Sequence, residues 1–442
     1  MVLYIIICLY ILLLFALGFR SHFRIKNSND FIVAGRKGTE VDITGSLLAT
    51  VVGSSAILGT LNLTVTQGWA ALWFLFSASL GLWVLVPKVE EIYNKQKLTL
   101  PQLIGSYYGN QAKFISSAII PIAWVGIVAA QIIGAAKILV TLTGTSYENC
   151  VYIAGFVLIT YTVLGGQVSI IKTDKIQSVF IYIGLFVFTA VLLFKDGFEH
   201  VEPLQQSFPF NSSFGVGDLF ILILTYSTTF LVGPDIYTRI FSSSSSKVAM
   251  HSVRNVAILL LPLSFVLCYV GMYINGLNMP VYSNGINFMA FVKGYAPETI
   301  FILCSLSLLS AVLSSADTTL LSASIILMDI RKSDDLSSLR RTRIIIVLLG
   351  LIATLIALKI GSIIKMLLTA LSFYSGAFII PVLAVLYLKQ KPKGNPMVAM
   401  ILGGSVALIG KVAVLMGHSW GNWIIVSAFT VNALCLFFLK KN

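Results

Sequence analysis

The sequence has little charge. Only 11% of its 442 residues are Asp, Glu, Lys or Arg, and 57% are hydrophobic, whereas a soluble globular chain carries about 25% charged residues. Long polar linkers are missing as well, because no polar stretch exceeds about 30 residues, so the apolar surface cannot be divided among several soluble cores. This composition excludes a soluble protein and predicts one that uses the lipid bilayer as its solvent.

Motifs of catalysis and metal binding are also missing. The chain contains no zincin motif, nucleophile elbow or phosphate-binding loop. Its histidines are scattered over loops and span ends, and its cysteines lie in or beside apolar stretches with a spacing that matches no metal or disulfide framework. These residues are His22, His200, His251 and His418, and Cys8, Cys150, Cys268, Cys304 and Cys435. We therefore expect no enzyme.

Apolar stretches long enough to cross a bilayer fill most of the chain. Windows of about 20 residues predict about 13 transmembrane helices and an all-α polytopic membrane protein. The first stretch has no basic residue ahead of it and no small-residue cleavage site, so we interpret it as an uncleaved helix. The predicted spans are 2–19, 43–66, 69–92, 114–142, 147–164, 175–195, 216–241, 253–276, 298–330, 341–359, 362–388, 396–416 and 421–439.

The net charge of +13 would suggest nucleic acid in a soluble chain. Here the distribution of the basic residues matters more than their sum. With these spans, 24 of the 30 Lys and Arg fall in one set of loops. Because cytoplasmic loops are rich in Lys and Arg, this asymmetry predicts an external N-terminus, a cytoplasmic C-terminus and an odd number of spans. We expect a multi-pass protein of the cell inner (plasma) membrane with no nucleic-acid partner.

The spans divide into one N-terminal helix, two sets of five, and two C-terminal helices. Because five is odd, the second set runs through the membrane inverted relative to the first, the arrangement many secondary transporters use for alternating access. The predicted units are an N-terminal helix and loop (1–42), repeat 1 (43–195), an external loop (196–215), repeat 2 (216–388) and the C-terminal helices (389–442). The external loops 196–215 and 277–297 contain Pro203, Pro209, Pro280 and Gly285, and could each hold a short helix or a partial lid.

Corresponding helices of the two sets carry helix-breaking residues. The first helix of set one contains Gly53-Ser54-Ser55, and that of set two contains Gly233-Pro234. A close helix contact or an ordinary proline kink would explain either one alone. Unwound backbone at membrane depth is tolerated where it lines a cavity, so the two breaks together predict a binding site.

Several motifs in order along the chain resemble the sodium:solute symporter family, whose inverted-repeat fold was first known from LeuT. The stretch from Ala129 through Lys137 to Asp174 is particularly similar to the proline permease branch. The resemblance covers nearly the whole chain and rests on Asp30–Arg36, Gly165-Gly166 with Thr173-Asp174 and Ile176-Gln177, Gly233–Arg239, Ser314–Thr318 with Met328–Ile330, and Phe373–Gly376.

The resemblance implies a site for a co-transported sodium ion. Sodium needs about five or six oxygen ligands with little net charge if it is to leave again. The family supplies them from carbonyls of the first core helix and the eighth, and from two hydroxyls of the eighth. The matching positions are Ala49, Val52, Ala311, Ser314 and Ser315. Alternatively, the two serines bond only to their own helix, as serine in membrane helices commonly does.

A carboxylate inside a span is costly and usually has a partner or a cation path. Asp317 lies three residues from Ser314, on the same helix face. Our hypothesis is that Asp317 and Thr318, with Asp174, form a second cation site or the intracellular exit route; family members with a second site have hydroxyls where Asp317 stands. The alternative is a structural ion pair with Lys175.

Other charged residues have simpler interpretations. Lys137 matches a basic position of the proline permease branch and could meet a substrate carboxylate, but snorkelling to the headgroups explains it better, as it does Lys411. Asp235 and Arg239, at i and i+4, are expected to pair with each other.

The substrate pocket is expected between the interrupted helices. Small hydroxyls and aromatic walls favour an amino acid or small carboxylate, and sugar-binding polar residues are absent from the matching places. The sequence thus predicts a sodium-coupled symporter of a small organic solute, functional as a monomer among membrane lipids. Proton coupling is the nearest alternative, and a uniporter or channel a more distant one. The candidate substrate residues are Thr50, Ser54, Ser55, Trp69, Trp73, Phe74, Gln131, Tyr226, Thr229 and Phe373.

Overall fold

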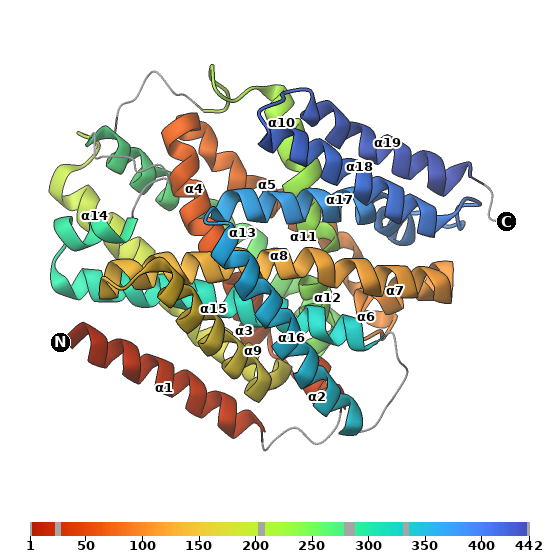
Figure 1. Ribbon diagram of the computed structural model, residues 1–442, viewed down its shortest axis with the longest axis horizontal. Coiled ribbons are helices and arrows are strands. Elements are labelled where there is room, and N and C mark those ends of the chain that lie inside the picture. Colours follow the sequence, from red (N-terminus) through yellow and green to blue (C-terminus); the bar gives the residue numbers. More distant parts are fainter. Residues whose placement is uncertain (1, 23–27, 202–207, 278–287, 330–335, 440–442) are drawn as a thin grey trace.

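The protein is a bundle of helices. The computed structural model describes residues 2–22, 28–201, 208–277, 288–329 and 336–439, and within these ranges every regular element is a helix, beside two isolated bridges. The two termini lie at opposite ends of the long axis of the molecule (Figure 1). The predicted all-α class is confirmed. Pro203, Pro280, Gly285, Lys440 and Lys441 lie outside the described residues.

The helices of the first half run from α1 to α9. In chain order they are α1 (Val2–His22), α2 (Ser28–Val33), η1 (Ala34–Arg36), α3 (Glu40–Val51), α4 (Ser54–Gln67), η2 (Gly68–Ala71), α5 (Leu72–Leu85), η3 (Val86–Lys88), α6 (Val89–Asn94), α7 (Leu100–Tyr108), α8 (Asn110–Thr143) and α9 (Tyr147–Asp196).

The helices of the second half run from α10 to α19. They are α10 (Val216–Leu222), η4 (Ile223–Ser227), α11 (Thr228–Val232), α12 (Pro234–Ser242), α13 (Ser246–Gly276), α14 (Phe288–Tyr295), α15 (Glu298–Met328), α16 (Leu336–Lys359), α17 (Ile363–Tyr387), α18 (Pro396–Leu415) and α19 (Gly421–Phe437). The short helix α14 lies in the predicted external loop 277–297, which confirms a helix there.

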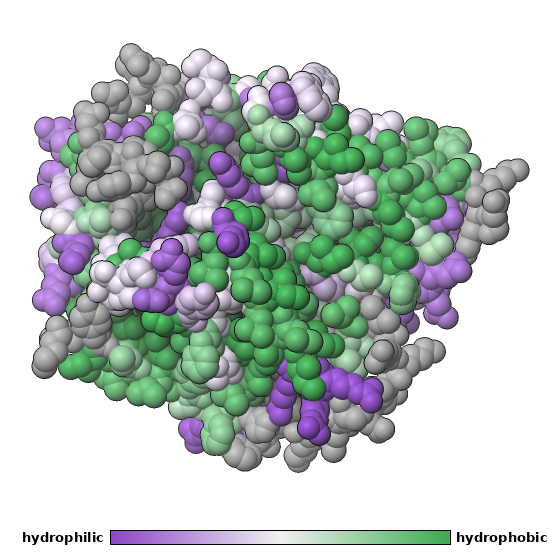
Figure 2. All heavy atoms as spheres, viewed as in Figure 1, coloured by the Kyte–Doolittle hydropathy of each residue, from purple (hydrophilic) through white to green (hydrophobic). Residues whose placement is uncertain are grey.

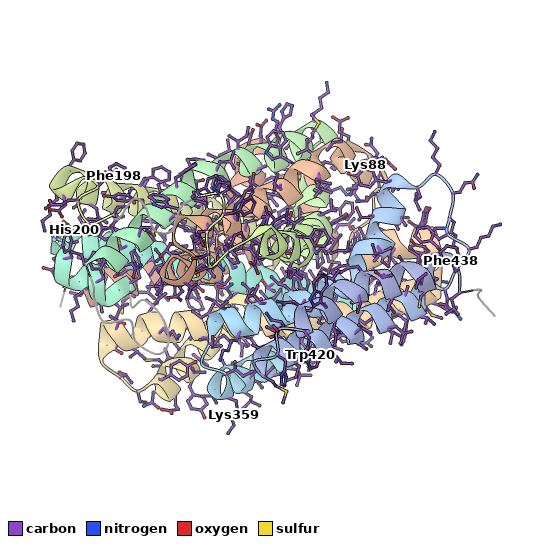
Figure 3. All side chains as sticks on the ribbon, turned by 90° about the horizontal axis from the view of Figure 1, so that it is seen from above. Lys88, Phe198, His200, Lys359, Trp420 and Phe438 are labelled. Carbon is purple, nitrogen blue, oxygen red and sulfur yellow. The ribbon has the colours of Figure 1, made fainter. Side chains whose placement is uncertain are left out.

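The apolar helices have the length of membrane spans. Among the described residues, nine helical stretches are long and apolar enough to cross a bilayer, and each of the predicted spans overlaps a helix. Hydrophobic residues cover the middle of the face in Figure 2, and hydrophilic residues gather toward its left and lower right edges. In Figure 3, Phe198 and His200 lie at one end of the long axis, and Lys88 and Phe438 at the other. This distribution fits a multi-pass membrane protein.

Helix α9 bends back on itself at one residue. Gly166 has φ 57° and ψ −176° inside the element, a conformation that a residue with a Cβ atom rarely adopts. The hydroxyls of Tyr161 and Thr173 are 2.6 Å apart, although twelve residues of straight helix span about 18 Å. The chain therefore reverses at Gly166, and its two arms correspond to the predicted spans 147–164 and 175–195.

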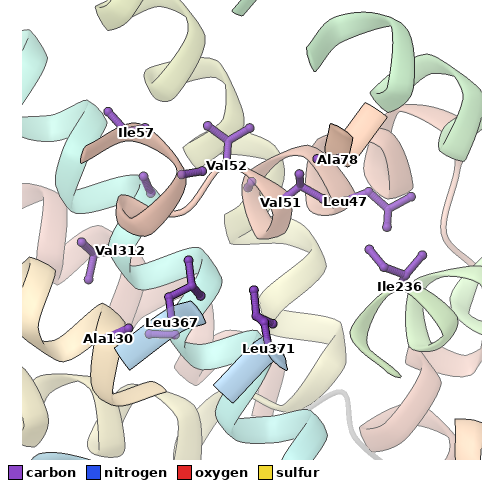
Figure 4. Packing of buried hydrophobic residues seen from close by; sticks show 14 of the residues in the cluster. Leu47, Val51, Val52, Ile57, Ala78, Ala130, Ile236, Val312, Leu367 and Leu371 are labelled. Carbon is purple, nitrogen blue, oxygen red and sulfur yellow. The ribbon is translucent and has the colours of Figure 1, made fainter. Parts of the chain in front are cut away.

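The two helix breaks predicted from glycine and proline are both present. Helix α3 ends at Val51, Val52 leaves the helical conformation with φ −93° and ψ 61°, and α4 begins at Ser54. Helix α11 ends at Val232, Gly233 is extended, and Pro234 begins α12. In Figure 4 the break at Val52 lies in the apolar core, and Leu367 and Leu371 of α17 point toward it. Each break frees backbone groups at the centre of the bundle.

Candidate functional site

The end of α3 presents carbonyl oxygens that the helix does not use. The N–H of Val52 bonds to the carbonyl of Leu48, and the N–H groups of Ala56 and Ile57 both bond to the carbonyl of Gly53. No backbone N–H of the described chain bonds to the carbonyls of residues 49–52. The last carbonyls of a helix need other partners, so this break offers a cluster of buried acceptors to side chains or to a cation.

Helix α15 places two hydroxyls against these carbonyls. Ser314 Oγ lies 2.9 Å from the carbonyl oxygen of Ala49 and 3.3 Å from that of Ala311. Ser315 Oγ lies 3.2 Å from the Ala49 carbonyl oxygen and 2.9 Å from that of Thr50. Both serines are buried. The alternative in which they bond only to their own helix does not hold, because each donates across the helix interface to α3.

Four of the five oxygens predicted for sodium thus converge. We call Ala49, Ala311, Ser314 and Ser315 the sodium cage, after the ion that the sequence predicts for them. Val52 follows α3 directly, and its carbonyl is not used by the helical ladder. A sixth oxygen, the carbonyl of Thr50, was not predicted and is brought in by Ser315. All of these oxygens are neutral, a property that suits a monovalent cation that must bind and leave.

A glycine makes this approach possible. A Cβ atom on Gly53 would lie 2.4 Å from Ser315 Oγ and 3.0 Å from Gln131 Nε2. Gln131 of α8 accepts a bond from Ser54 Oγ at 2.7 Å and donates to Ser55 Oγ at 3.0 Å. Gly53 therefore has a steric reason to be glycine, and the first turn of α4 is tied to α8 by side-chain hydrogen bonds.

A cavity adjoins the sodium cage. It encloses ≈ 560 Å³ of space between atoms, including its open mouth, and five of the ten predicted substrate residues line it: Thr50, Ser55, Gln131, Tyr226 and Thr229. Ser315 lines it as well, so the cage and the cavity share a wall. A few convergent polar groups in an apolar setting are typical of small-molecule sites.

The other predicted substrate residues lie behind or away from the cavity. Ser54 is behind its wall, bonded to Gln131, and Phe74 stacks on the outer side of Tyr226 with ring centroids 4.1 Å apart. Trp69 is not among the lining residues. Trp73 donates its indole N–H to the Pro209 carbonyl at 2.9 Å, so it contacts the loop predicted to be external instead.

Phe373 of α17 does not line this cavity. The ring faces α18, because a Cβ atom on Gly404 would lie 3.1 Å from it. Phe373 and the cavity-facing residues Leu367 and Leu371 belong to the same helix. The sequence pattern did not distinguish the faces of α17 because apolar residues surround that helix on all sides.

Sequence reasoning missed several lining residues, including Thr319. The apolar wall from Ile127, Phe230, Ile236, Leu367 and Leu371 carries no distinguishing pattern. Trp124 of α8 is 2% exposed, and its indole Nε1 has no hydrogen-bond partner among the described residues. Asp235 of α12 also lines the cavity. Asp235 directly follows the Gly-Pro break, and this position could have indicated a lining residue. From the sequence, we instead expected Asp235 to pair with Arg239.

That ion pair is not formed, and Arg239 has a different partner. Its guanidinium Nη2 lies 3.2 Å from Asp174 Oδ2 and bonds to Thr318 Oγ1 as well, and its Nε donates to Ser46 Oγ at 3.1 Å. The guanidinium of Arg239 thus points from α12 toward α9 and α15, and not back along α12 to Asp235. We call Arg239, Asp174, Ser46, Thr318 and Asp317 the arginine cluster.

Asp317 is the least satisfied member of the arginine cluster. One of its oxygens accepts from the backbone N–H of Thr318 at 2.5 Å, and Oδ2 has no hydrogen-bond partner among the described residues. The alternative of an ion pair with Lys175 does not hold, because Lys175 Nζ lies 2.7 Å from Asp42 Oδ1 at the start of α3. Asp174 Oδ1 and Arg239 Nη1 also lack hydrogen-bond partners within the described chain.

Two broken helices around converging buried oxygens and a cavity are typical of secondary transporters. Comparison with known proteins makes the class specific. Residues 31–403 match the sodium:solute symporter family, and the chain belongs to that family. At this level it is a membrane transporter and not an enzyme.

Relatives and solved structures agree with the family. The sodium/proline symporter 2 of Staphylococcus saprophyticus is 22% identical and aligns over 99% of this chain and 92% of its own. The sodium/proline symporter of Escherichia coli is 24% identical, but the match covers 56% of this chain and about half, 52%, of that protein. A Na⁺-coupled sialic acid symporter in a substrate-bound outward-open state superposes with a TM-score of 0.79 at 15% identity, covering 99% of this chain and 96% of that chain. A nucleobase-cation-symport-1 family transporter superposes with a TM-score of 0.59 at 13% identity, covering 91% and 92%. These superpositions establish the fold.

Proposed function

We propose that this protein is a sodium-coupled symporter that imports a small organic solute by alternating access. The proposal rests on one observation: four predicted sodium ligands from α3 and α15 converge on one buried point beside a solute-sized cavity. Sodium would be bound as cargo by the sodium cage, with the Val52 carbonyl as its fifth ligand. Because Ser315 belongs to both the cage and the cavity wall, solute and ion would stabilise the same closed arrangement of α3 and α15.

The proposed topology is an external N-terminus, a cytoplasmic C-terminus and 13 spans with an inverted repeat of 43–195 and 216–388. The opposite positions of the termini support an odd number of crossings (Figure 1). The breaks in α3–α4 and α11–α12 begin the two proposed repeats, as an inverted repeat requires. We place the protein in the cell inner (plasma) membrane and expect the monomer to be the functional unit, since all ligands of the cage come from one chain.

For the solute we propose an amino acid or a small carboxylate. The relatives named above as proline symporters support this class, and the cavity offers hydroxyls of Thr50, Ser55 and Thr229, the amide of Gln131 and aromatic walls. Its volume of ≈ 560 Å³, which includes the mouth, suits a compact solute.

For Asp317, Thr318 and Asp174 we propose the intracellular exit route rather than a second cation site. Arg239 supports this choice, because its guanidinium is bonded to both Asp174 and Thr318. A second inorganic cation at these oxygens would have to displace a cation that is covalently part of the protein. A route that opens when Arg239 exchanges partners needs no such displacement.

Solute counterflow and gradient-driven uptake in proteoliposomes test the function. We expect an inward sodium gradient to drive accumulation of one member of an amino acid and carboxylate panel above its equilibrium level, and a potassium gradient to drive none. Accumulation driven by a proton gradient without sodium would favour proton coupling. Flux that saturates poorly and never exceeds equilibrium would favour a channel or uniporter.

A further inference from the structure

The cavity contains one formally charged side chain. Of the residues that line it, Asp235 alone carries a carboxylate, and no Lys, Arg or His lines it. Asp235 is half-buried and forms no ion pair within the described residues. Buried carboxylates in proteins are normally paired. This carboxylate is therefore available to a charge that enters the cavity.

Arg239 does not form an ion pair with Asp235. Arg239, one helical turn farther along α12, directs its guanidinium to Asp174, Ser46 and Thr318. Asp317 is a second carboxylate near the same guanidinium, so the arginine cluster has no positive charge to spare. The N-terminus of α12 offers Asp235 a partial positive charge of about half a unit, which offsets only part of a full negative charge.

The cavity wall also suits a nitrogen-centred cation. Trp124, Tyr226 and Phe230 line the cavity together with Asp235, and aromatic faces attract ammonium groups. The unpartnered indole N–H of Trp124 is a donor that a carboxylate of the solute would satisfy. Ser55 of α4 and Gln131 of α8 also line the cavity and carry hydrogen-bond donors, and neither belongs to α12. An acceptor on one helix and donors on others match a molecule that carries both charges.

We infer that Asp235 binds the ammonium group of the solute, so that the transported class is ammonium-bearing compounds, amino acids above all, and not simple carboxylates. This inference rests on the proposed function, since it assigns a substrate class to the same cavity. It chooses between amino acids and small carboxylates, the two solute classes that the hydroxyls and aromatic walls do not distinguish. A plain carboxylate would bring a second negative charge beside Asp235, whereas a zwitterion neutralises it.

Pairs of solutes that differ only by the nitrogen test the inference. L-Proline is compared with cyclopentanecarboxylate, and L-alanine with propionate, by equilibrium binding to the purified full chain in detergent. We expect the ammonium member of at least one pair to bind about tenfold or more tightly than its nitrogen-free partner, because a charged hydrogen bond is lost without it. Asp235→Asn should weaken the binding of the ammonium member by about tenfold or more, and should therefore reduce the difference in affinity between the two members of the pair.

Asp218→Asn is the matched control, because Asp218 also stands in the first turn of a helix but does not line the cavity. It should leave binding unchanged, and the thermal unfolding midpoint of Asp235→Asn should stay close to that of the wild type. Equal binding of both members by the wild type, failure of both amino acids to bind, or unchanged discrimination in Asp235→Asn would overturn the inference. The inference would also be overturned if Asp235→Asn changed only the pH or sodium dependence of solute binding and left the preference for the ammonium member unchanged.

Repeating the titrations in potassium chloride separates this inference from the proposed function. If the ammonium member binds equally tightly in sodium and in potassium chloride but more tightly than its nitrogen-free partner, sodium coupling fails while the role of Asp235 stands. If sodium strengthens binding but the two members of each pair bind equally tightly, the role of Asp235 fails while sodium coupling stands.

Discussion

Two buried polar clusters share helix α15 within about one turn, and they are built on opposite principles. The sodium cage consists of neutral oxygens: the hydroxyls of Ser314 and Ser315, the Ala49 carbonyl freed by the break in α3, and the Ala311 carbonyl of α15. The arginine cluster consists of charges, with Arg239 held by Asp174 and Thr318, and with Asp317 beside them. One cluster consists of neutral oxygens only, and the other contains a cation of its own, the guanidinium of Arg239.

The difference in charge between the two clusters predicts different effects of substitution on ion binding and on folding stability. Neutral oxygens stabilise a monovalent ion without a large charge penalty when it leaves. A buried ion pair, in contrast, leaves an uncompensated charge when either partner is removed. We therefore expect substitutions in the sodium cage to change ion affinity with little effect on folding, and substitutions in the arginine cluster to change folding first.

The largest effect should come from Arg239→Ala. It leaves the buried carboxylate of Asp174 without its guanidinium, and breaking such a pair costs about 3–5 kcal/mol. We expect a much lower thermal unfolding midpoint in detergent and poor recovery of the protein. Arg254→Ala, at an exposed position on α13, should have almost no effect.

A neutral version of the arginine cluster tests the cause. Combining Arg239→Met with Asp174→Asn and Asp317→Asn removes every charge and should recover much of the lost stability. Equal losses for Arg239→Ala and Arg254→Ala would show that the ion pair does not stabilise the fold.

The next effect concerns the sodium cage. Replacing Ser314 and Ser315 together with alanine removes two of the proposed ligands. We expect the sodium concentration for half-maximal solute binding to rise about 100-fold, at about 1.4 kcal/mol for each hydroxyl. The measurement is solute binding over a sodium titration.

Ser324→Ala is the matched control for the cage, because Ser324 is a buried serine on the same helix that donates only to its own helix, to the Leu320 carbonyl at 2.7 Å. Its sodium dependence should match that of the wild type. If the double variant keeps its sodium dependence, the two hydroxyls are not ligands.

The contrast between the clusters also shows what could be predicted from the sequence. The spans, the two helix breaks and the cage follow from hydropathy, from glycine and proline, and from the family motifs, all of which are local signals. The partner of Arg239 does not follow from local signals, since Asp174 is 65 residues away and Asp235 is four. The i, i+4 rule assumes a helix surface in solvent, whereas α12 is buried and its arginine is drawn into the core.

A smaller effect is expected for Asp317→Asn. If Asp317 belongs to the exit route, the sodium half-saturation should stay within about threefold, and uptake should slow by a similar factor because ion release is altered. Stability should not fall, because the variant removes the carboxylate that lacks a partner at Oδ2. Asp174→Asn is the contrasting control, and it should destabilise the protein because it breaks the ion pair. A tenfold or larger rise in the sodium half-saturation of Asp317→Asn would instead identify Asp317 as a cation ligand.

The smallest effect is expected at the exposed counterpart of the buried pair, the ion pair between Asp42 and Lys175. Asp174 and Lys175 are adjacent in α9, yet the former is fully buried and the latter has a side chain 45% exposed. Partial burial disfavours the charge on Asp42, but hydrogen bonds from Lys175 and Thr39 outweigh it, and the pKa of this carboxyl is lowered. The stabilisation is therefore present near neutral pH and lost as pH falls through that lowered value. Asp42→Asn should cost only about 0.5 kcal/mol at neutral pH, seen as a small shift in unfolding midpoint that disappears in acid. A loss as large as that of Asp174→Asn would mean that burial does not separate the two pairs.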